Sequence, residues 1–192
     1  MPHTCPWWFG YFLLNPMRRF AQRPSRILGP FVREGMLVVE PGCGMGFFTL
    51  DLVRMVGPPG RVVAIDLQEK MLAGLRGRAA RAGLEERLET RLARPDHLGI
   101  ADLVGQVDLV LAFYVVHELA EPAGFFSEVA AALKPGGTVL VVEPPLHVSR
   151  AAFEARLALA EPAGLRVVER PRIGPNKAAV LGHGDRPGRG EP

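Results

Sequence analysis

The sequence predicts an α/β fold in which a mostly parallel sheet is covered by helices. From residue 37 onward, short runs rich in Val and Leu alternate with longer stretches of helical pattern, as expected of strands joined by crossover helices. Residues 109–113 and 139–142 are apolar without polar alternation, which is typical of strands buried on both faces. With 192 residues, of which 48% are hydrophobic and 22% charged, the chain fits one domain with a sizeable core.

Strands and helices alternate along the chain, and turn residues separate them. The expected strands are Leu37–Glu40, Arg61–Ile65, Leu88–Leu92, Val107–Ala112, Thr138–Glu143, Leu165–Glu169 and Lys177–Leu181. The expected helices are Phe47–Val56, Gln68–Ala82, Ala123–Leu133 and Arg150–Ala163. Ser149 is placed to cap the last helix, and Gly164 is placed to end it.

The last two expected strands are joined only by residues 170–176. A right-handed crossover between parallel strands needs about a dozen residues or more. These two strands should therefore pair antiparallel as a hairpin. The residues alone predict a mostly parallel sheet with one reversed strand at its edge.

A glycine-rich loop follows the first expected strand, which ends at Glu40. Glycines at 42, 44 and 46 allow tight turns and close approach of a ligand at the carboxyl edge of the sheet. The dinucleotide fingerprint requires a third Gly or Ala where Phe47 stands, and the Gly-Lys-Ser/Thr of a Walker loop is absent. An acid, one spacer and three alternating glycines instead resemble motif I of the class I S-adenosylmethionine-dependent methyltransferases.

The resemblance covers about residues 25–182 and includes Asp66 at the end of the second strand, a segment like motif IV at 108–114 and a Lys-Pro-Gly-Gly turn at 134–137. It implies a Rossmann-like, doubly wound, seven-stranded sheet in the order 3-2-1-4-5-7-6, with one antiparallel strand. The implied cofactor is S-adenosyl-L-methionine, with S-adenosyl-L-homocysteine as product. The implied cofactor-binding residues are Glu40, Gly42, Gly44, Gly46, Asp66, Leu67, Asp96 and Phe113.

Individual roles follow from the resemblance and from the chemistry of each group. Asp66 is expected to take both ribose hydroxyls, since a carboxylate accepts two hydrogen bonds at once. Glu40 is expected near the amino end of the methionine part of the cofactor, or alternatively to cap backbone donors. Leu67 and Met71 are expected to flank the adenine, and Asp96 to lie near the adenine amino group.

Acceptor-side residues should follow the fourth and fifth strands. The candidate catalytic residues are Tyr114, His117 and Glu143. His117 suits a general base because its ordinary pKa lies close to neutrality; alternatively, His117 and Glu118 only form the polar first turn of a helix. A sulfonium donor carries its own leaving group, so neither a protein nucleophile nor a metal is required, and positioning of the acceptor is the main task.

The first 36 residues differ from the rest of the chain. They hold five arginines against one acid and seven of the 14 aromatic residues. We expect an N-terminal aromatic and Arg-rich helical segment over 1–36, a methyltransferase domain over 37–182 and a flexible tail over 183–192. The segment over 1–36 is expected to pack on the sheet as a helix with solvated arginines; a lid over the acceptor and a dimer contact are the alternatives.

The expected activity is methyl transfer to a small-molecule acceptor, because no recognition module for a macromolecule accompanies the sheet. An RNA methyltransferase and a cofactor-binding protein without catalysis are the alternatives. The near-neutral chain after residue 36 argues against nucleic acid. Two cysteines argue against an arsenite acceptor and predict a cytoplasmic protein. No apolar run is long enough to span a membrane, and a monomer or homodimer is expected.

Overall fold

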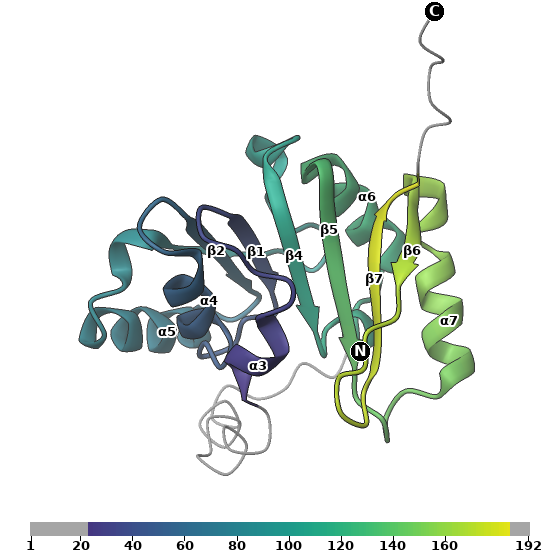
Figure 1. Ribbon diagram of the computed structural model, residues 1–192, viewed down its shortest axis with the longest axis horizontal. Helices are drawn as coiled ribbons and strands as arrows, with labels where there is room; N and C mark the ends of the chain where they lie inside the picture. Colours follow the sequence, from purple (N-terminus) through teal and green to yellow (C-terminus); the bar gives the residue numbers. More distant parts are fainter. Residues whose placement is uncertain (1–22, 185–192) are drawn as a thin grey trace, which may run out of the picture.

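The computed structural model describes residues 23–184, and within them seven strands form a single sheet in the order β3-β2-β1-β4-β5-β7-β6 (Figure 1). This order confirms the one implied by the resemblance. The strands are β1 (Leu37–Pro41), β2 (Arg61–Asp66), β3 (Leu88–Leu92), β4 (Val107–Phe113), β5 (Leu133–Glu143), β6 (Leu165–Glu169) and β7 (Lys177–His183). Each expected strand is therefore present.

Strand β7 is the reversed strand, and it pairs antiparallel with both β5 and β6. The hairpin of β6 and β7 is confirmed, but the position of the reversed strand at the sheet edge is wrong. The apolar residues 178–181 of β7 are buried, whereas residues 166–169 of β6 are exposed. An interior place for β7 buries its apolar residues on both faces, and the more polar β6 forms the edge.

Five α-helices and four short 3-10 turns connect the strands within the described range. The helices are α3 (Pro24–Leu28), α4 (Thr49–Val56), α5 (Glu69–Arg81), α6 (Pro122–Ala132) and α7 (Arg150–Ala158). The turns are η1 (Glu85–Arg87), η2 (Ala101–Leu103), η3 (Val116–Glu118) and η4 (Glu161–Ala163). Helices α3, α4 and α5 cover one face of the sheet, and α6 and α7 cover the other (Figure 1).

Three helices are shorter than the sequence pattern predicts, although α5 loses only one residue at each end, Gln68 and Ala82, which are its caps. Helix α4 begins at Thr49 rather than Phe47, because Phe48 is its N-cap and accepts the first helical bond, from Leu52. Helix α7 ends at Ala158, since Pro162 has no N–H to continue the helical bonds. Ser149 caps α7 as expected, its Oγ accepting from the amide of Ala152 at 3.1 Å.

Strand β5 begins earlier than expected, at Leu133. Leu133 pairs with Val107, while Thr138 pairs with Leu109, so the register shifts between the two pairs. The Lys-Pro-Gly-Gly turn therefore lies as an irregularity inside β5.

The core consists of two apolar layers, one on each face of the sheet. Leu28 of α3 is fully buried in the layer that α4 and α5 cover, and this contact anchors the described part of the N-terminal segment. Residues 1–22 and 185–192, which include most of the expected N-terminal segment and tail, lie outside the described residues. Gly182 and His183 belong to β7. No helix between residues 23 and 184 is long and apolar enough to cross a membrane.

Candidate cofactor and acceptor site

A cavity of about 560 Å³ opens where β1, β2 and β4 end. The parallel strands bring their carboxyl ends to this edge of the sheet, which is the usual ligand position in open α/β folds. Nine of the predicted site residues line the cavity: Glu40, Gly42, Gly44, Asp66, Leu67, Asp96, Phe113, Tyr114 and His117. Gly46 and Glu143 are not among the residues that line it.

The glycine loop contributes backbone to the cavity wall. Gly44 has a φ of +54°, and a Cβ placed on it would meet no atom within 4 Å. The loop therefore leaves space for a ligand to approach its backbone. Gly46 has a φ of +81°, and its Cβ would lie 2.3 Å from Leu75 Cδ1. Gly46 thus serves the packing of the loop on α5 rather than the cavity.

Asp66 ties the glycine loop to the end of β2. Its Oδ2 accepts from the Gly44 amide and its Oδ1 from the Gln68 amide, each at 2.9 Å. Burial raises the pKa of Asp66, and the backbone hydrogen bonds oppose this shift. A carboxylate accepts about four hydrogen bonds, so Asp66 retains capacity for a ligand.

Glu40 is a buried carboxyl group, 4% exposed, at the start of the same loop. Burial raises the pKa of Glu40 to about 8, while the hydroxyl of Thr49, which donates to Oε2 at 2.6 Å, opposes the shift and the charge of Asp66 adds to it. A positive ligand group would favour the ionised form of both carboxyls. The two carboxyl groups, Glu40 and Asp66, therefore suit a ligand that carries a positive charge.

His117 and Glu143 form a pair on the acceptor side of the cavity. The Nδ1 of His117 lies 2.5 Å from Glu143 Oε2, and the His117 amide donates to Oε1 at 3.0 Å. Glu143 is fully buried, and its hydrogen bond raises the pKa of His117. Arg156 of α7 donates to the carbonyls of Val116 and His117, at 2.9 and 3.1 Å. Glu143, which does not line the cavity, thus holds the orientation of His117 through its two contacts.

Tyr114 has a left-handed backbone at the end of β4. Its φ of +61° is the one positive value among the non-glycine residues of the described range. Such strain in a residue of this size is usually found at functional sites. The hydroxyl of Tyr114 donates to Asn176 Oδ1 at 2.6 Å, which ties the cavity to the β6–β7 connection.

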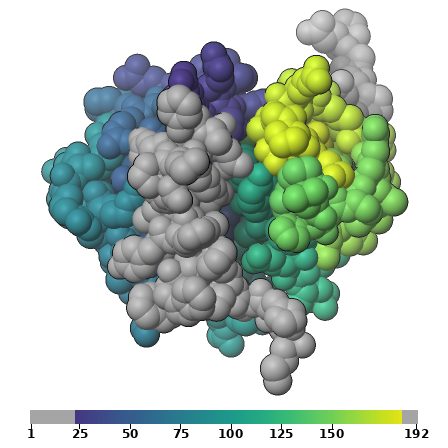
Figure 2. Space-filling view, turned by 90° about the horizontal axis from the view of Figure 1, so that it is seen from below, coloured from purple at the N-terminus to yellow at the C-terminus, as the bar shows by residue number. Residues whose placement is uncertain are grey.

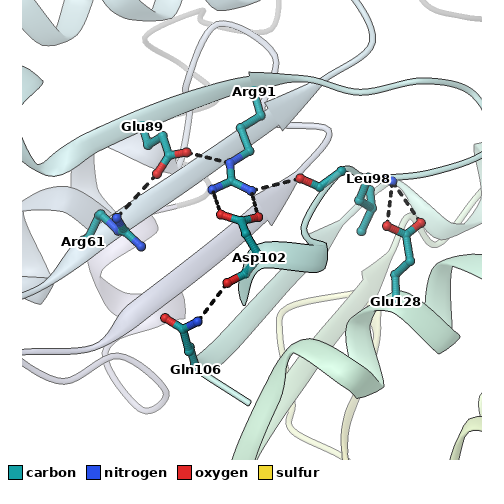
Figure 3. Close-up of polar contacts among 8 residues, drawn as sticks. Arg61, Glu89, Arg91, Leu98, Asp102, Gln106 and Glu128 are labelled. Carbon is teal, nitrogen blue, oxygen red and sulfur yellow. Dashed lines mark hydrogen bonds and ion pairs between the residues drawn. The ribbon is translucent and has the colours of Figure 1, made fainter. Parts of the chain in front are cut away.

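The loop between β3 and η2 carries Asp96, which is exposed and pairs with Arg94 at 3.9 Å. The loop is held at its far end, as Figure 3 shows. There the carboxylate of Glu128 in α6 accepts from the Leu98 amide at 3.0 and 3.1 Å. Arg91 of β3 donates to the carbonyl of Gly99 at 2.9 Å and forms a two-point ion pair with Asp102.

Four residues that contribute to the site were missed by the sequence analysis. They are Thr49, Glu128, Arg156 and Asn176. Each acts on a residue of another element, and no local motif marks such a partner. Met71, which was expected to flank the adenine, and His147 both line the cavity.

The fold is that of class I methyltransferases. A family model described as a methyltransferase domain matches residues 39–141, more than half of the chain, and the chain therefore belongs to this family. Among solved structures, a SAM-dependent methyltransferase from Aquifex aeolicus is 27% identical with a TM-score of 0.81, and the match covers 93% of this chain and 98% of that one.

Curated relatives match over part of their length. A demethylmenaquinone methyltransferase from Lactococcus lactis is 30% identical over 62% of this chain and 48% of its own. A ubiquinone biosynthesis O-methyltransferase from Caulobacter vibrioides is 33% identical over 62% of this chain and 44% of its own. An arsenite methyltransferase from Halobacterium salinarum is 32% identical over 56% and 27%. The matched regions thus span less than half of these relatives.

Proposed function

We propose that the protein transfers a methyl group from S-adenosylmethionine to a small-molecule acceptor. The observation that carries this proposal is the buried carboxyl of Glu40 and the half-buried carboxyl of Asp66 around an open glycine loop in a cavity of about 560 Å³. When bound, the cofactor supplies a methyl group on a positively charged sulfur that is its own leaving group. The family membership of the chain supports this choice of cofactor.

In this proposal, Asp66 accepts from the two ribose hydroxyls while it holds the loop through the Gly44 amide. Glu40 pairs with the cofactor ammonium, which offsets the cost of ionising a buried carboxyl. Leu67 and Phe113 provide apolar surface, and Asp96 lies where the adenine amino group is expected. These roles use the cavity wall and leave the region after β4 for the acceptor.

On the acceptor side, we assign His117 as the residue that removes a proton where the acceptor has one to lose. In its neutral form, His117 donates from Nδ1 to Glu143, which leaves Nε2 free to accept a proton. The arrangement of a base and a buried carboxylate that orients it recurs in many catalytic sites. Tyr114 lines the cavity beside His117 and helps to confine the acceptor.

A small organic acceptor agrees with the names of the quinone-related relatives. An arsenite acceptor needs several thiolates, whereas the chain has two cysteines, of which Cys43 is buried with a raised pKa. Among residues 23–184, no group of three or more His, Cys, Asp or Glu side chains could hold a metal ion.

The test is calorimetric titration with S-adenosylmethionine and S-adenosylhomocysteine, followed by screening of cell extract for transfer of a labelled methyl group. Binding of both ligands and a labelled small product are expected. Absence of binding would refute the proposal. Binding without transfer would favour a non-catalytic protein, and label in RNA would favour the nucleic-acid alternative.

We also propose that the first 36 residues cover the acceptor. Deletion of residues 1–20 should weaken methyl transfer more than cofactor affinity, and protein stability is measured separately. If folding, cofactor binding and methyl transfer are all unchanged, this part of the proposal fails.

A further inference from the structure

A second cavity, of about 640 Å³, lies between α3 and the β6–β7 connection. Its walls come from two segments far apart in the sequence, residues 23–31 and 169–176. In Figure 2 the purple α3 segment and the yellow β6–β7 segment lie next to one another on the edge of the sheet where the parallel strands end. Apart from Asn176, which accepts the hydrogen bond of Tyr114, none of its lining residues has a role in the site described above.

Basic side chains dominate the charge of this second cavity. Arg23, Arg26 and Arg172 line it against one acid, Glu169. Arg26 and Arg172 are exposed, and neither forms an ion pair or a side-chain hydrogen bond with another residue of the described range. Two guanidinium groups from different segments on one cavity wall favour an anionic group such as a carboxylate or a phosphate.

The remaining wall is largely apolar. Ile27 and Phe31 come from the α3 segment, and buried Ile173 comes from the β6–β7 connection, where prolines 171 and 175 flank it. The chemistry of the wall therefore suits a molecule with an apolar body and one anionic group. A bare inorganic ion would leave this apolar surface unused.

The second cavity adjoins the acceptor side of the first. Asn176 lines the second cavity and accepts the hydrogen bond of Tyr114, which lines the first. Lys177, next along the chain, donates to the carbonyl of Pro145 at 3.1 Å, just after β5. The β6–β7 connection is thus fixed to the segments after both β4 and β5, from which acceptor contacts are expected.

We propose that this cavity binds the carboxylate or phosphate end of an amphiphilic acceptor, through Arg26 and Arg172, while the methylated end lies beside His117. The inference rests on the proposed function and names the class of its acceptor. A short groove with few arginines suits a single anionic group, whereas a nucleic-acid strand is usually tracked by an extended basic surface.

The experiment titrates the full chain, saturated with S-adenosylhomocysteine, with phenyl phosphate, benzoate and benzyl alcohol. The test variant is the double substitution Arg26→Gln with Arg172→Gln. The matched control is the double substitution Arg81→Gln with Arg87→Gln, which removes the same two charges at positions that line neither cavity. Thermal unfolding of each variant verifies the fold, and S-adenosylhomocysteine affinity is measured first.

We expect at least one aryl anion to bind at least about tenfold more tightly than benzyl alcohol, and the test variant to lose this advantage while the control keeps it. The stronger of phenyl phosphate and benzoate identifies the anion. If S-adenosylhomocysteine binds but the anions do not, or if both variants behave alike, this inference is overturned and the proposed function is not. If S-adenosylhomocysteine does not bind, the proposed function itself fails.

Discussion

The two ends of the main cavity are built in different ways. At the cofactor end, Glu40 and Asp66 act with the glycine loop between them, so the parts lie within 30 residues of sequence. At the acceptor end, His117 pairs with Glu143 and Tyr114 pairs with Asn176, which are 26 and 62 residues away. The cofactor end uses backbone groups with one buried and one half-buried acid, whereas the acceptor end uses side-chain pairs between segments far apart in the sequence.

The difference predicts that single substitutions at the cofactor end act mainly on ligand affinity. Asp66→Ala should weaken S-adenosylhomocysteine by about 100-fold or more, since it removes a charged acceptor of the ribose and the anchor of the Gly44 amide. Asp96→Ala, in an exposed side chain on the same cavity, should cost far less. Calorimetry measures both, and equal losses would contradict the assignment.

Glu40 should make cofactor binding depend on pH. Its pKa of about 8 means that the free protein carries a proton there at neutral pH, and a ligand ammonium must displace it. Affinity should therefore fall by up to about tenfold per pH unit below pH 8. Glu40→Gln should flatten this dependence between pH 6 and 8. An unchanged slope in the variant would show that another group releases the proton.

The same group affects the stability of the ligand-free protein. The pKa of Glu40 in the folded chain lies above its ordinary value of 4.5. Its contribution to stability is therefore complete below about pH 4.5 and is lost as pH rises towards about 8. In urea unfolding without ligand, the free energy of unfolding should fall less over this pH range in Glu40→Gln than in the wild-type protein.

At the acceptor end, substitutions should act on proton affinity instead. Glu143→Gln should lower the pKa of His117, because the hydrogen bond to Glu143 is the largest cause of its raised value. NMR titration of the His117 ring C–H measures this shift. Glu154→Gln on the exposed face of α7 is the control and should leave the His117 resonance unchanged.

The His117–Glu143 pair should also make the stability of the folded protein depend on pH. Because the pKa of His117 is raised on folding, its contribution is complete below about pH 6.5 and is lost as pH rises through the folded value. Glu143→Gln should remove this pH dependence. A wild-type protein with no such loss between pH 6.5 and 8 would argue that the pair is weak.

The smallest effect is expected in the loop that bears Asp96. Glu128→Ala should raise the KM for S-adenosylmethionine by about threefold to tenfold and leave kcat unchanged, since Glu128 lines the cavity and holds the Leu98 amide but lies apart from His117 and Glu143 in sequence and hydrogen bonding. Hydrogen exchange at Leu98 should accelerate. Glu161→Ala in exposed η4 is the control, and a matching change there would contradict a positioning role.

The sequence was sufficient for the fold because the strands carry strong local signals. Uninterrupted Val and Leu runs predicted β4 and most of β5, and the short connection predicted the hairpin of β6 and β7. The residue pattern alone did not place β7 inside the sheet. A run of apolar residues predicts a strand but does not say which strand forms the free edge. The family resemblance supplied that order.

For the site, the cofactor loop was predictable because its acid and glycines are neighbours in sequence. Glu128 and Asn176 were not, because each meets its partner only after a crossover brings distant segments together. Glu143 was predicted among the catalytic residues, yet its full burial behind His117 follows only from the packing of β5.

The interior place of β7 has a consequence for synthesis. Strand β7 is the last strand among residues 23–184, but it separates β5 from β6 in the sheet. Until residues 177–183 have left the ribosome, β5 and β6 each present an unpaired edge, and such edges promote aggregation. A chain that terminates a few residues before Lys177 would keep every residue of the cofactor loop and still lack a closed sheet.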